Sequence, residues 1–139
     1  MEEKKIGTNE VLNVSFAVVV TPEDIDDIMC TALEGGITYW CNRAKVVGDY
    51  LGEYGHEQIA RGGELEMHVV EPFDEEDTEW YTLTKEKLLK GLEAYLKEPR
   101  HGDFLEFVDH ELKLDTCNVD ANVADSIVQY ALFGEEIYG

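Results

Sequence analysis

Residues 21–36 constrain the fold of this chain more than any other segment, because they carry a nearly complete set of helix signals. Thr21 is a favourable N-cap residue, Pro22 suits the first helical position, and acidic residues occupy the first turn. Gly35 and Gly36 predict where the helix ends. Between these signals, apolar residues recur at helical spacing, namely Ile25, Ile28, Met29, Ala32 and Leu33.

Three other segments of the first two thirds of the chain have strand or loop patterns. Residues 14–20 are mostly apolar and β-branched, which predicts a buried strand before the helix. Apolar side chains alternate with polar ones over residues 65–69, which predicts a half-buried strand with residues 80–83 as its hairpin partner. Residues 37–47 fit neither periodicity, and the glycine-rich stretch after them predicts irregular structure or short helical turns.

Two further helices are predicted in the last third of the chain. Thr84 is the cap of the first, which ends before Pro99, while Asp120 is the cap of the second, which Gly134 terminates. Residues 104–114 are compatible with either a strand or a helix. The inner face of the first helix consists of Leu88, Leu89, Leu92, Tyr95 and Leu96, and that of the second of Val123, Ala124, Ile127, Val128, Ala131 and Leu132.

The order of these elements predicts the fold class. A strand, a helix, a hairpin and two helices indicate an α+β fold in which about three helices pack on a small antiparallel sheet. The length of 139 residues suits a single domain over residues 1–139, with residues 1–10 the part most open to flexibility.

The charge of the chain restricts its partners. There are 31 Asp and Glu residues against 11 Lys and Arg, which gives a formal net charge of −20. Such a charge argues against direct binding to nucleic acid or anionic membrane and favours a basic protein surface. A content of 44% hydrophobic and 10% aromatic residues indicates a folded protein instead of a disordered acidic tail. Residues 6–42 and 114–139 contain no Lys or Arg at all.

The predicted hairpin turn is the most acidic local feature. A block of like charge is usually a solvated turn, and it is also suited to contact a basic surface in place of nucleic acid. Six carboxylates lie within this block, namely Glu71, Asp74, Glu75, Glu76, Asp77 and Glu79.

The first helix supplies a second acidic set. Glu23, Asp24 and Asp27 share one helix face, on which neighbouring Cβ atoms stand about 5–6 Å apart. This distance is close to the spacing of strand phosphates, although acids in a first turn also complement the helix dipole. Among the aromatic residues, Tyr50, Tyr54 and Trp80 lie between acids and glycines and are candidate interface anchors, to which aromatic side chains are suited.

Motifs for catalysis and for cofactors are weak. Cys30, Cys41 and Cys117 and the four histidines have no metal-binding spacing, so only a site assembled from distant residues stays open. The two serines have no nucleophile-elbow context, and the glycines lack the Lys and Ser or Thr of a phosphate loop. We therefore expect no catalytic residues, no metal site and no cofactor. We also expect a cytoplasmic location, because the start lacks a signal-peptide layout and no apolar run is long enough to span a bilayer.

Three stretches of the chain together resemble a group of short, uncharacterised proteins of bacteriophages and mobile elements. These stretches are residues 32–41 (ALEGGITYWC), residues 83–91 and residues 124–139, which end in ALFGEEIYG. The resemblance implies a genetic setting and brings no catalytic residues. Small acidic phage proteins are often similar to inhibitors of host nucleases or CRISPR effectors, several of which mimic nucleic acid.

Charge and resemblance together suggest a function. We expect a non-enzymatic, anti-CRISPR-like protein that binds the basic surface of a host nucleic-acid-handling defence protein. One alternative is an accessory protein of a mobile element whose acidity serves solubility, and a second is a metal-binding protein or enzyme. The oligomeric state stays open.

Overall fold

The structure is a computed structural model that describes residues 7–71 and 74–139, without the side chains of residues 71 and 74–78. Its helices and strands are mixed along the chain, with more strands than the sequence predicts. They are β1 (Val18–Val19), α1 (Pro22–Thr31), the π-helical turn η1 (Ala32–Gly36), β2 (Cys41–Val46), the 3-10 turn η2 (Gly55–Glu57), β3 (Leu65–Glu71), β4 (Asp74–Leu83), α2 (Lys85–Lys97), β5 (Leu105–Val108), β6 (Glu111–Leu114), the 3-10 turn η3 (Thr116–Asn118) and α3 (Ala121–Phe133).

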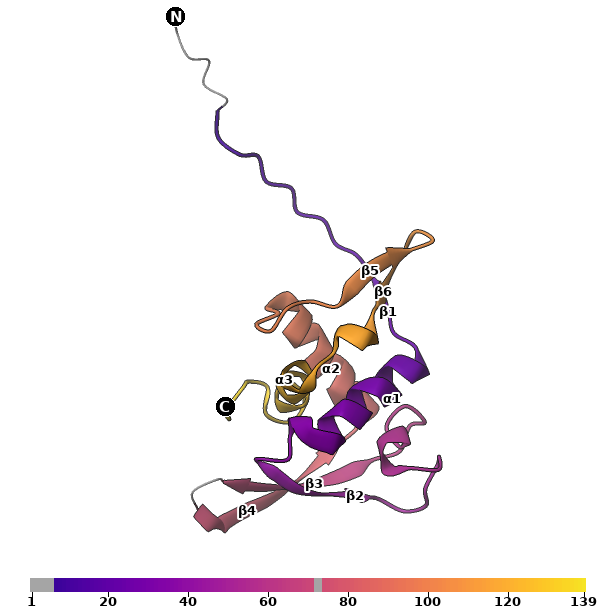
Figure 1. Ribbon diagram of the computed structural model, residues 1–139, viewed down its shortest axis with the longest axis vertical. Helices are drawn as coiled ribbons and strands as arrows, with labels where there is room; N and C mark the ends of the chain where they lie inside the picture. Colours follow the sequence, from indigo (N-terminus) through magenta and orange to yellow (C-terminus); the bar gives the residue numbers. More distant parts are fainter. Residues whose placement is uncertain (1–6, 72–73) are drawn as a thin grey trace, which may run out of the picture.

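The strands form two small sheets with the helices between them (Figure 1). One sheet has the order β2-β3-β4 and is antiparallel throughout. The other has the order β1-β6-β5, with β5 and β6 antiparallel and β1 parallel to β6. The predicted α+β class is therefore confirmed, with two three-stranded sheets where one was expected.

Helix α1 begins as the sequence predicts. The Thr21 hydroxyl accepts a hydrogen bond from the amide of Asp24 at 3.1 Å, and the Asp24 carboxylate accepts one from the amide of Thr21 at 2.9 Å. This reciprocal pair is a capping box, which satisfies two amides at the start of the helix. The helix continues through η1 and ends at Gly36, as the pair of glycines predicts.

The β3–β4 hairpin is also confirmed, whereas β2 was not predicted. In β3 the alternation holds, since Leu65, Met67 and Val69 are buried. Strand β2 is an edge strand in which only Cys41 is fully buried. Its sequence therefore lacks the alternation of apolar and polar residues that predicts a strand. The stretch from residue 48 to 63 contains only turns and η2, as expected.

Helices α2 and α3 lie against each other, and both have the predicted caps. Thr84 accepts from the amide of Lys87, and Asp120 accepts from the amide of Val123. Gly134 ends α3 in a left-handed conformation with φ of 75°. The two helices approach each other closely at Gly91, where an added Cβ would lie 2.5 Å from the carbonyl oxygen of Ile127.

Residues 104–114 form the β5–β6 hairpin, which settles the open choice between strand and helix. The hairpin turns at Asp109 and His110, whose φ values are 51° and 69°. Two positive φ values in a two-residue loop match the twist of the flanking strands. The Asn-Gly or Asp-Gly pair that usually indicates such a turn is absent here, which explains why the sequence left it undecided.

The prediction of a buried strand over residues 14–20 is wrong. Only Val18 and Val19 pair with another strand, and residues 7–17 form no regular secondary structure. Val14 and Phe16 are mostly exposed. Because β6 is only four residues long, it offers β1 few partners, and the chain before β1 runs away from the body of the molecule (Figure 1).

Candidate functional site

A stripe of carboxylates runs along α1 and η1. Glu23, Asp27 and Glu34 are exposed and lie near one side of the helix, with Cys30 between Asp27 and Glu34. Burial raises the pKa of the Cys30 thiol, and the carboxylates of Glu34 and Asp27 raise it further. A raised pKa disfavours the thiolate, which is the form of cysteine that attacks electrophiles and binds metals.

The two segments without Lys or Arg pack against each other and extend this stripe. η3 lies against α1, and the hydroxyl of Thr116 donates to the Asp27 carboxylate at 2.8 Å. Asp115 caps η3 by accepting from the amide of Cys117, and Asp120 caps α3 by accepting from the amide of Val123. We call the exposed carboxylates of Glu23, Asp27 and Glu34 the acidic face.

Few cations approach the acidic face. Among the described residues, the ion pairs that reach the two base-free segments come from Arg61, which lies 3.5 Å from Asp26, and Arg100, which lies 3.3 Å from Glu136. Neither pair involves a carboxylate of the acidic face. Arg61 also pairs with Glu57 at 3.1 Å, so its charge is shared between two acids.

The predicted α1 residues differ in what they contact. Glu23 is exposed, whereas the carboxylate of Asp24 is half-buried and holds the capping box, so Asp24 serves the helix end. Asp27 keeps one oxygen on Thr116 and remains exposed. Within this predicted set, Glu23 and Asp27 are the two exposed residues.

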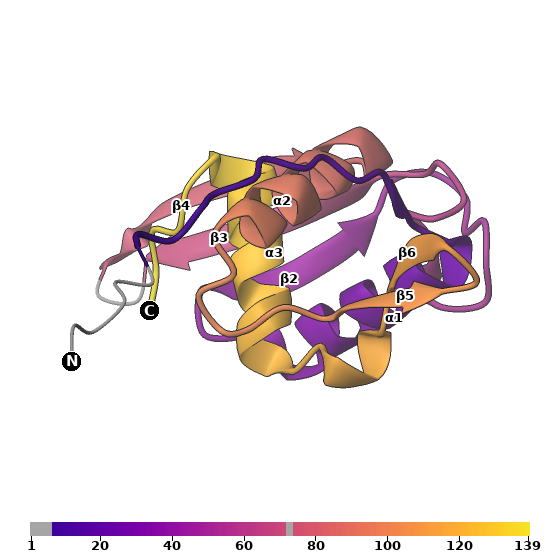
Figure 2. The same cartoon turned by 90° about the horizontal axis from the view of Figure 1, so that it is seen from above.

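The acidic hairpin lies apart from α1. The end of the β3–β4 hairpin and the start of α1 are on opposite sides of the molecule in both views (Figures 1 and 2). Glu79 is exposed and accepts a hydrogen bond from the Tyr81 hydroxyl at 2.7 Å. The side chains of Glu71, Asp74, Glu75, Glu76 and Asp77 lie outside the described residues. The described part of the hairpin and the start of α1 are therefore on different sides of the molecule.

The three candidate aromatic anchors are exposed and fall into two groups. Tyr50 and Tyr54 lie in the loop between β2 and η2, where Tyr54 stacks on His56. Trp80 lies on the outer face of the β2-β3-β4 sheet, with its ring 4.6 Å from that of His68. His68 pairs with Arg43 on its other side. Across the sheet, Trp80 therefore lies beside His68, with Arg43 one strand further on. In the sequence, by contrast, its neighbours include acids.

A polar network that the sequence analysis missed joins α3 to the segment before β2. Asp125 accepts from the Tyr39 hydroxyl at 2.6 Å, from the Trp40 indole at 2.7 Å and from the Gln129 side chain at 2.8 Å. Burial raises the pKa of Tyr39 far above its ordinary value, and the Asp125 carboxylate adds to the effect. With three donors already bound, Asp125 has a structural role.

Gln129 extends this network to the C-terminal segment. Its buried side-chain oxygen accepts from the amides of Ile137 and Tyr138 at 2.7 and 2.8 Å, and its nitrogen donates to the Tyr138 carbonyl. Tyr138 in turn stacks on Trp40. The spacing of Asp125 and Gln129, four residues apart on one helix face, was the signal in the sequence. The network thus joins residues 39–40 to residues 125–138.

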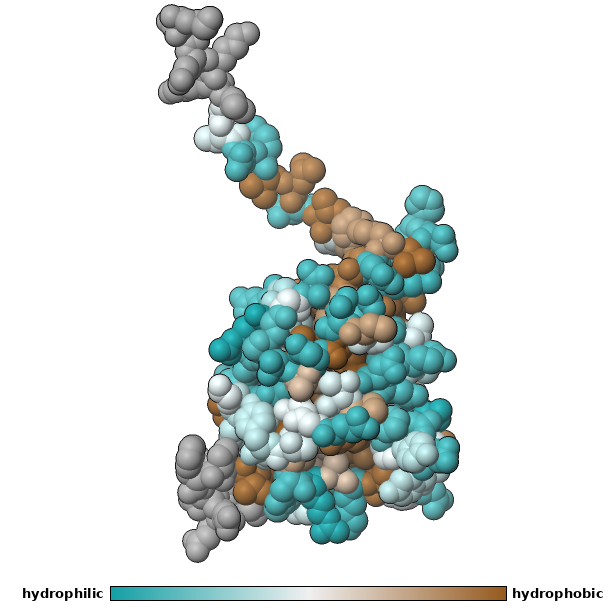
Figure 3. Space-filling view, viewed as in Figure 1, coloured by the Kyte–Doolittle hydropathy of each residue, from teal (hydrophilic) through white to brown (hydrophobic). Residues whose placement is uncertain are grey.

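An apolar arm and a groove form the second unusual surface. Residues 7–17, which we call the N-terminal arm, expose 81% of Val11, 85% of Leu12, 63% of Val14 and 59% of Phe16. Figure 3 shows brown, apolar patches along the arm, separated by hydrophilic ones. The apolar residues of the arm are its Val11, Leu12, Val14, Phe16 and Ala17.

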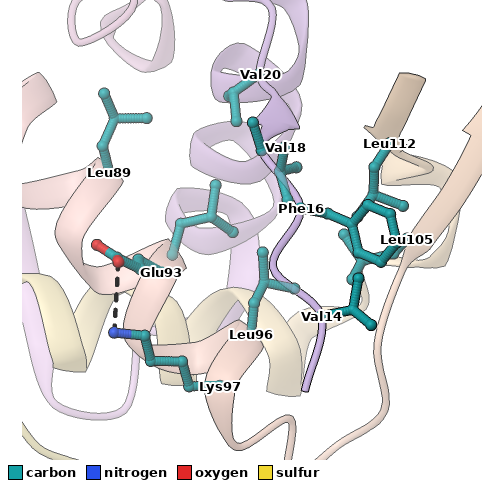
Figure 4. A pocket seen from close by; sticks show the side chains of 12 residues that line it. Val14, Phe16, Val18, Val20, Leu89, Glu93, Leu96, Lys97, Leu105 and Leu112 are labelled. Atoms are coloured by element: carbon teal, nitrogen blue, oxygen red, sulfur yellow. Dashed lines mark ion pairs between the residues drawn. The ribbon is translucent and has the colours of Figure 1, made fainter. Parts of the chain in front are cut away.

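The arm runs into an open groove with a volume of about 640 Å³ (Figure 4). Val14, Phe16, Val18 and Val20 line one wall, and the ring of Phe16 meets that of Phe107 edge-on at 5.2 Å. The opposite walls come from α2, β5 and β6, through Leu89, Leu92, Leu96, Leu105 and Leu112.

Neither surface has the features of a metal site. Among the described side chains, which leave out those of residues 71–78, no three His, Cys, Asp or Glu residues come together in a way that could hold a metal ion, and all three cysteines are free. None of the described helices has the length and apolar character needed to cross a membrane.

Comparison of the chain with protein-family models, with curated proteins and with solved structures gives no match.

Proposed function

We propose that this protein is a non-enzymatic binding module whose acidic face occupies the basic, nucleic-acid-binding surface of a host defence protein. The observation that carries this proposal is the packing of α1 and η1, from one base-free segment, against η3 and α3, from the other. Asp27 of α1 and Thr116 of η3 meet at this contact, in a region to which neither segment contributes a Lys or Arg.

The spacing on α1 supports a likeness to a phosphate row. Glu23 and Asp27 are one helical turn apart, so their Cβ atoms are separated by about 5–6 Å. Phosphates recur along a nucleic-acid strand on a similar scale. A basic groove that binds successive phosphates would therefore meet carboxylates at comparable intervals along α1.

The net charge of −20 supports the same proposal through the rate of encounter. A strongly acidic protein is steered towards a basic partner, which raises the association rate, and salt screens this attraction. At physiological ionic strength the screening length is about 8 Å, so binding should weaken as salt is added.

The alternative is an accessory role in which the acidity serves solubility, and the distribution of the other acids favours it. Exposed carboxylates also occur on α2, on the β5–β6 hairpin and in the loop before η2, for example at Glu86, Glu106 and Glu53. The two proposals differ in whether binding of a partner requires the acidic face. A role in solubility requires no particular face.

The test compares two variants with equal loss of charge. The first is Glu23→Gln, Asp27→Asn and Glu34→Gln on the acidic face. The second is Glu86→Gln, Glu98→Gln and Glu106→Gln, which are exposed positions on other elements. Asp27→Asn keeps an oxygen that can accept from Thr116, so both variants should fold.

Each variant is used to capture proteins from host lysate at low and high salt, with duplex DNA or RNA as competitor. We expect a nucleic-acid-binding protein that the competitor displaces and high salt releases. The acidic-face variant should bind the captured protein about tenfold to a hundredfold more weakly, since it loses three charge pairs of about 0.5–1 kcal/mol each. Equal binding by both variants would remove the acidic face from the proposal.

A further inference from the structure

We infer that the N-terminal arm pairs with the arm of a second copy of this chain, in an antiparallel ribbon centred on Val14. The inference starts from the exposure of four large apolar side chains on a segment that projects from the body (Figures 1 and 3). Scattered apolar residues on a surface are normal, whereas a continuous apolar strand edge is a template for pairing.

The distribution of charged residues indicates that the partner of the arm is a second copy of this chain. Residues 11–22 contain no charged side chain and form the longest such run in the chain. Two molecules that each carry −20 repel one another over most of their surfaces, so they can meet only through an uncharged segment. A basic partner, by contrast, would be drawn to the acidic face and has no reason to select this run.

Alternation along the arm gives it one apolar side. Leu12, Val14 and Phe16 are spaced two residues apart, as are Val18 and Val20 after them, so in an extended chain all five point the same way. Four of the five line the groove (Figure 4). A second strand that presents the same side would cover the open part of this groove with its own apolar residues.

The register follows from the same alternation. In an antiparallel pair, directly opposite residues share a face, so centring on Val14 sets it against itself and sets Leu12 against Phe16 of the second copy. A shift by one residue would place Val14 opposite Asn13 or Ser15, and Leu12 opposite Ser15 or Ala17, so the apolar side of one arm would face the more polar side of the other. Centring further along, at Ser15, would bring the two acidic bodies closer together.

The length of the arm keeps the two bodies apart. From Val14 to Val18 in both copies, the extended chain spans about 25 Å in total at roughly 3.3 Å per residue. This exceeds the screening length of about 8 Å at physiological salt, so the repulsion between the bodies is largely screened. Pairing through the arms is thus compatible with the charge, whereas pairing of the bodies is not.

The first test measures the oligomeric state of the full chain by sedimentation over a range of protein concentrations, at low and high salt. We expect a dimer whose dissociation constant falls as salt is added, because salt screens the repulsion between the two bodies. Binding through the acidic face has the opposite salt dependence, so failure of either proposal is recognised separately. A monomer at every concentration in both salts would overturn the inference and leave the acidic-face proposal untouched.

Matched variants locate the contact. Val14→Asp should raise the dissociation constant at least about tenfold, since it sets two like charges directly opposite each other and removes two valines from the ribbon. Ser15→Asp adds the same charge on the other side of the arm and should change the constant much less. Unfolding of both monomers should match that of the natural chain, because position 14 is exposed. Equal effects of the two substitutions on dimerisation would contradict the ribbon.

A cysteine at the centre tests the register directly. Opposite Cα atoms in an antiparallel pair are about 4.5–5.5 Å apart, which a disulfide can bridge. Val14→Cys should therefore give a covalent dimer on mild oxidation, whereas Ser15→Cys should stay at the level that the natural Cys30, Cys41 and Cys117 produce. Equal crosslinking at both positions would rule out the proposed pairing. A second measurement sediments the natural chain with neutral phosphatidylcholine vesicles. If the chain binds the vesicles as a monomer and forms no dimer, the proposed pairing is also ruled out.

Discussion

The N-terminal arm and the C-terminal segment after α3 have similar backbones, but they differ in the contacts that fix them to the body of the molecule. Both lack regular secondary structure, and both carry large apolar side chains beside the body of the molecule. The C-terminal segment is fixed by three hydrogen bonds to Gln129 and by the stacking of Tyr138 on Trp40. Among the described residues, no side-chain hydrogen bond involves residues 7–17, and the arm has one aromatic contact, between Phe16 and Phe107.

This difference shows what holds an irregular segment in place. An extended chain leaves its amides and carbonyls without partners, so apolar contact alone seldom fixes it. Gln129 supplies both a donor and an acceptor from a buried position, and the C-terminal segment needs both. The arm has no such residue beneath it, which is why a second strand is the partner that its backbone can accept.

The largest expected contrast comes from truncating one aromatic side chain in each region. Trp40→Ala should lower the free energy of unfolding by about 3–5 kcal/mol, because Trp40 is buried against Phe133 and Tyr138. Phe16→Ala should change it by no more than about 0.5 kcal/mol in the monomer, as an exposed position does. Urea denaturation at low protein concentration measures both, and equal losses would mean that the arm is part of the core.

A smaller loss of stability is expected when only the hydrogen bonds of the Gln129 side chain are removed. Gln129→Leu keeps the size of the side chain while leaving the amides of Ile137 and Tyr138 without their acceptor. We expect a cost of about 2–3 kcal/mol and fast hydrogen exchange at these two amides, with little change elsewhere in α3. If the two amides stay protected, the stacking of Tyr138 on Trp40 is sufficient to hold the segment.

The smallest effect concerns the pH dependence of the same network. The pKa of Tyr39 is raised in the folded state, so above pH of about 10 the unfolded chain ionises this group first. The stability that Tyr39 contributes is complete below that pH and is lost as pH rises towards its folded pKa. Tyr39→Phe should flatten this alkaline decline in a series of unfolding curves, whereas Tyr50→Phe, an exposed control, should not.

The sequence predicted those parts of the fold that local signals determine. The caps at Thr21, Thr84 and Asp120 were recognised because each is a short motif whose hydrogen bonds stay within a few residues. The β3–β4 hairpin was recognised because its inner face alternates. Strand β2 was missed because an edge strand can be exposed at most of its positions.

Errors arose where the environment of a segment depends on distant elements. The apolar run over residues 14–20 has the composition of a core strand, yet the short β6 pairs with only two of its residues. The base-free segments were visible in the sequence, but their contact through Thr116 and Asp27 was not, because it joins residues 89 positions apart. The network around Asp125 was missed for the same reason.

The close approach of α2 and α3 at Gly91 has a consequence for how the molecule can move. Because even a methyl group at position 91 would collide with the α3 backbone, the two helices are closely packed there and their separation leaves no slack. α2 also carries Leu89, Leu92 and Leu96 in the groove wall. A strand arriving at this groove therefore meets a wall of fixed shape, so any adjustment on docking falls to the arm and the β5–β6 hairpin.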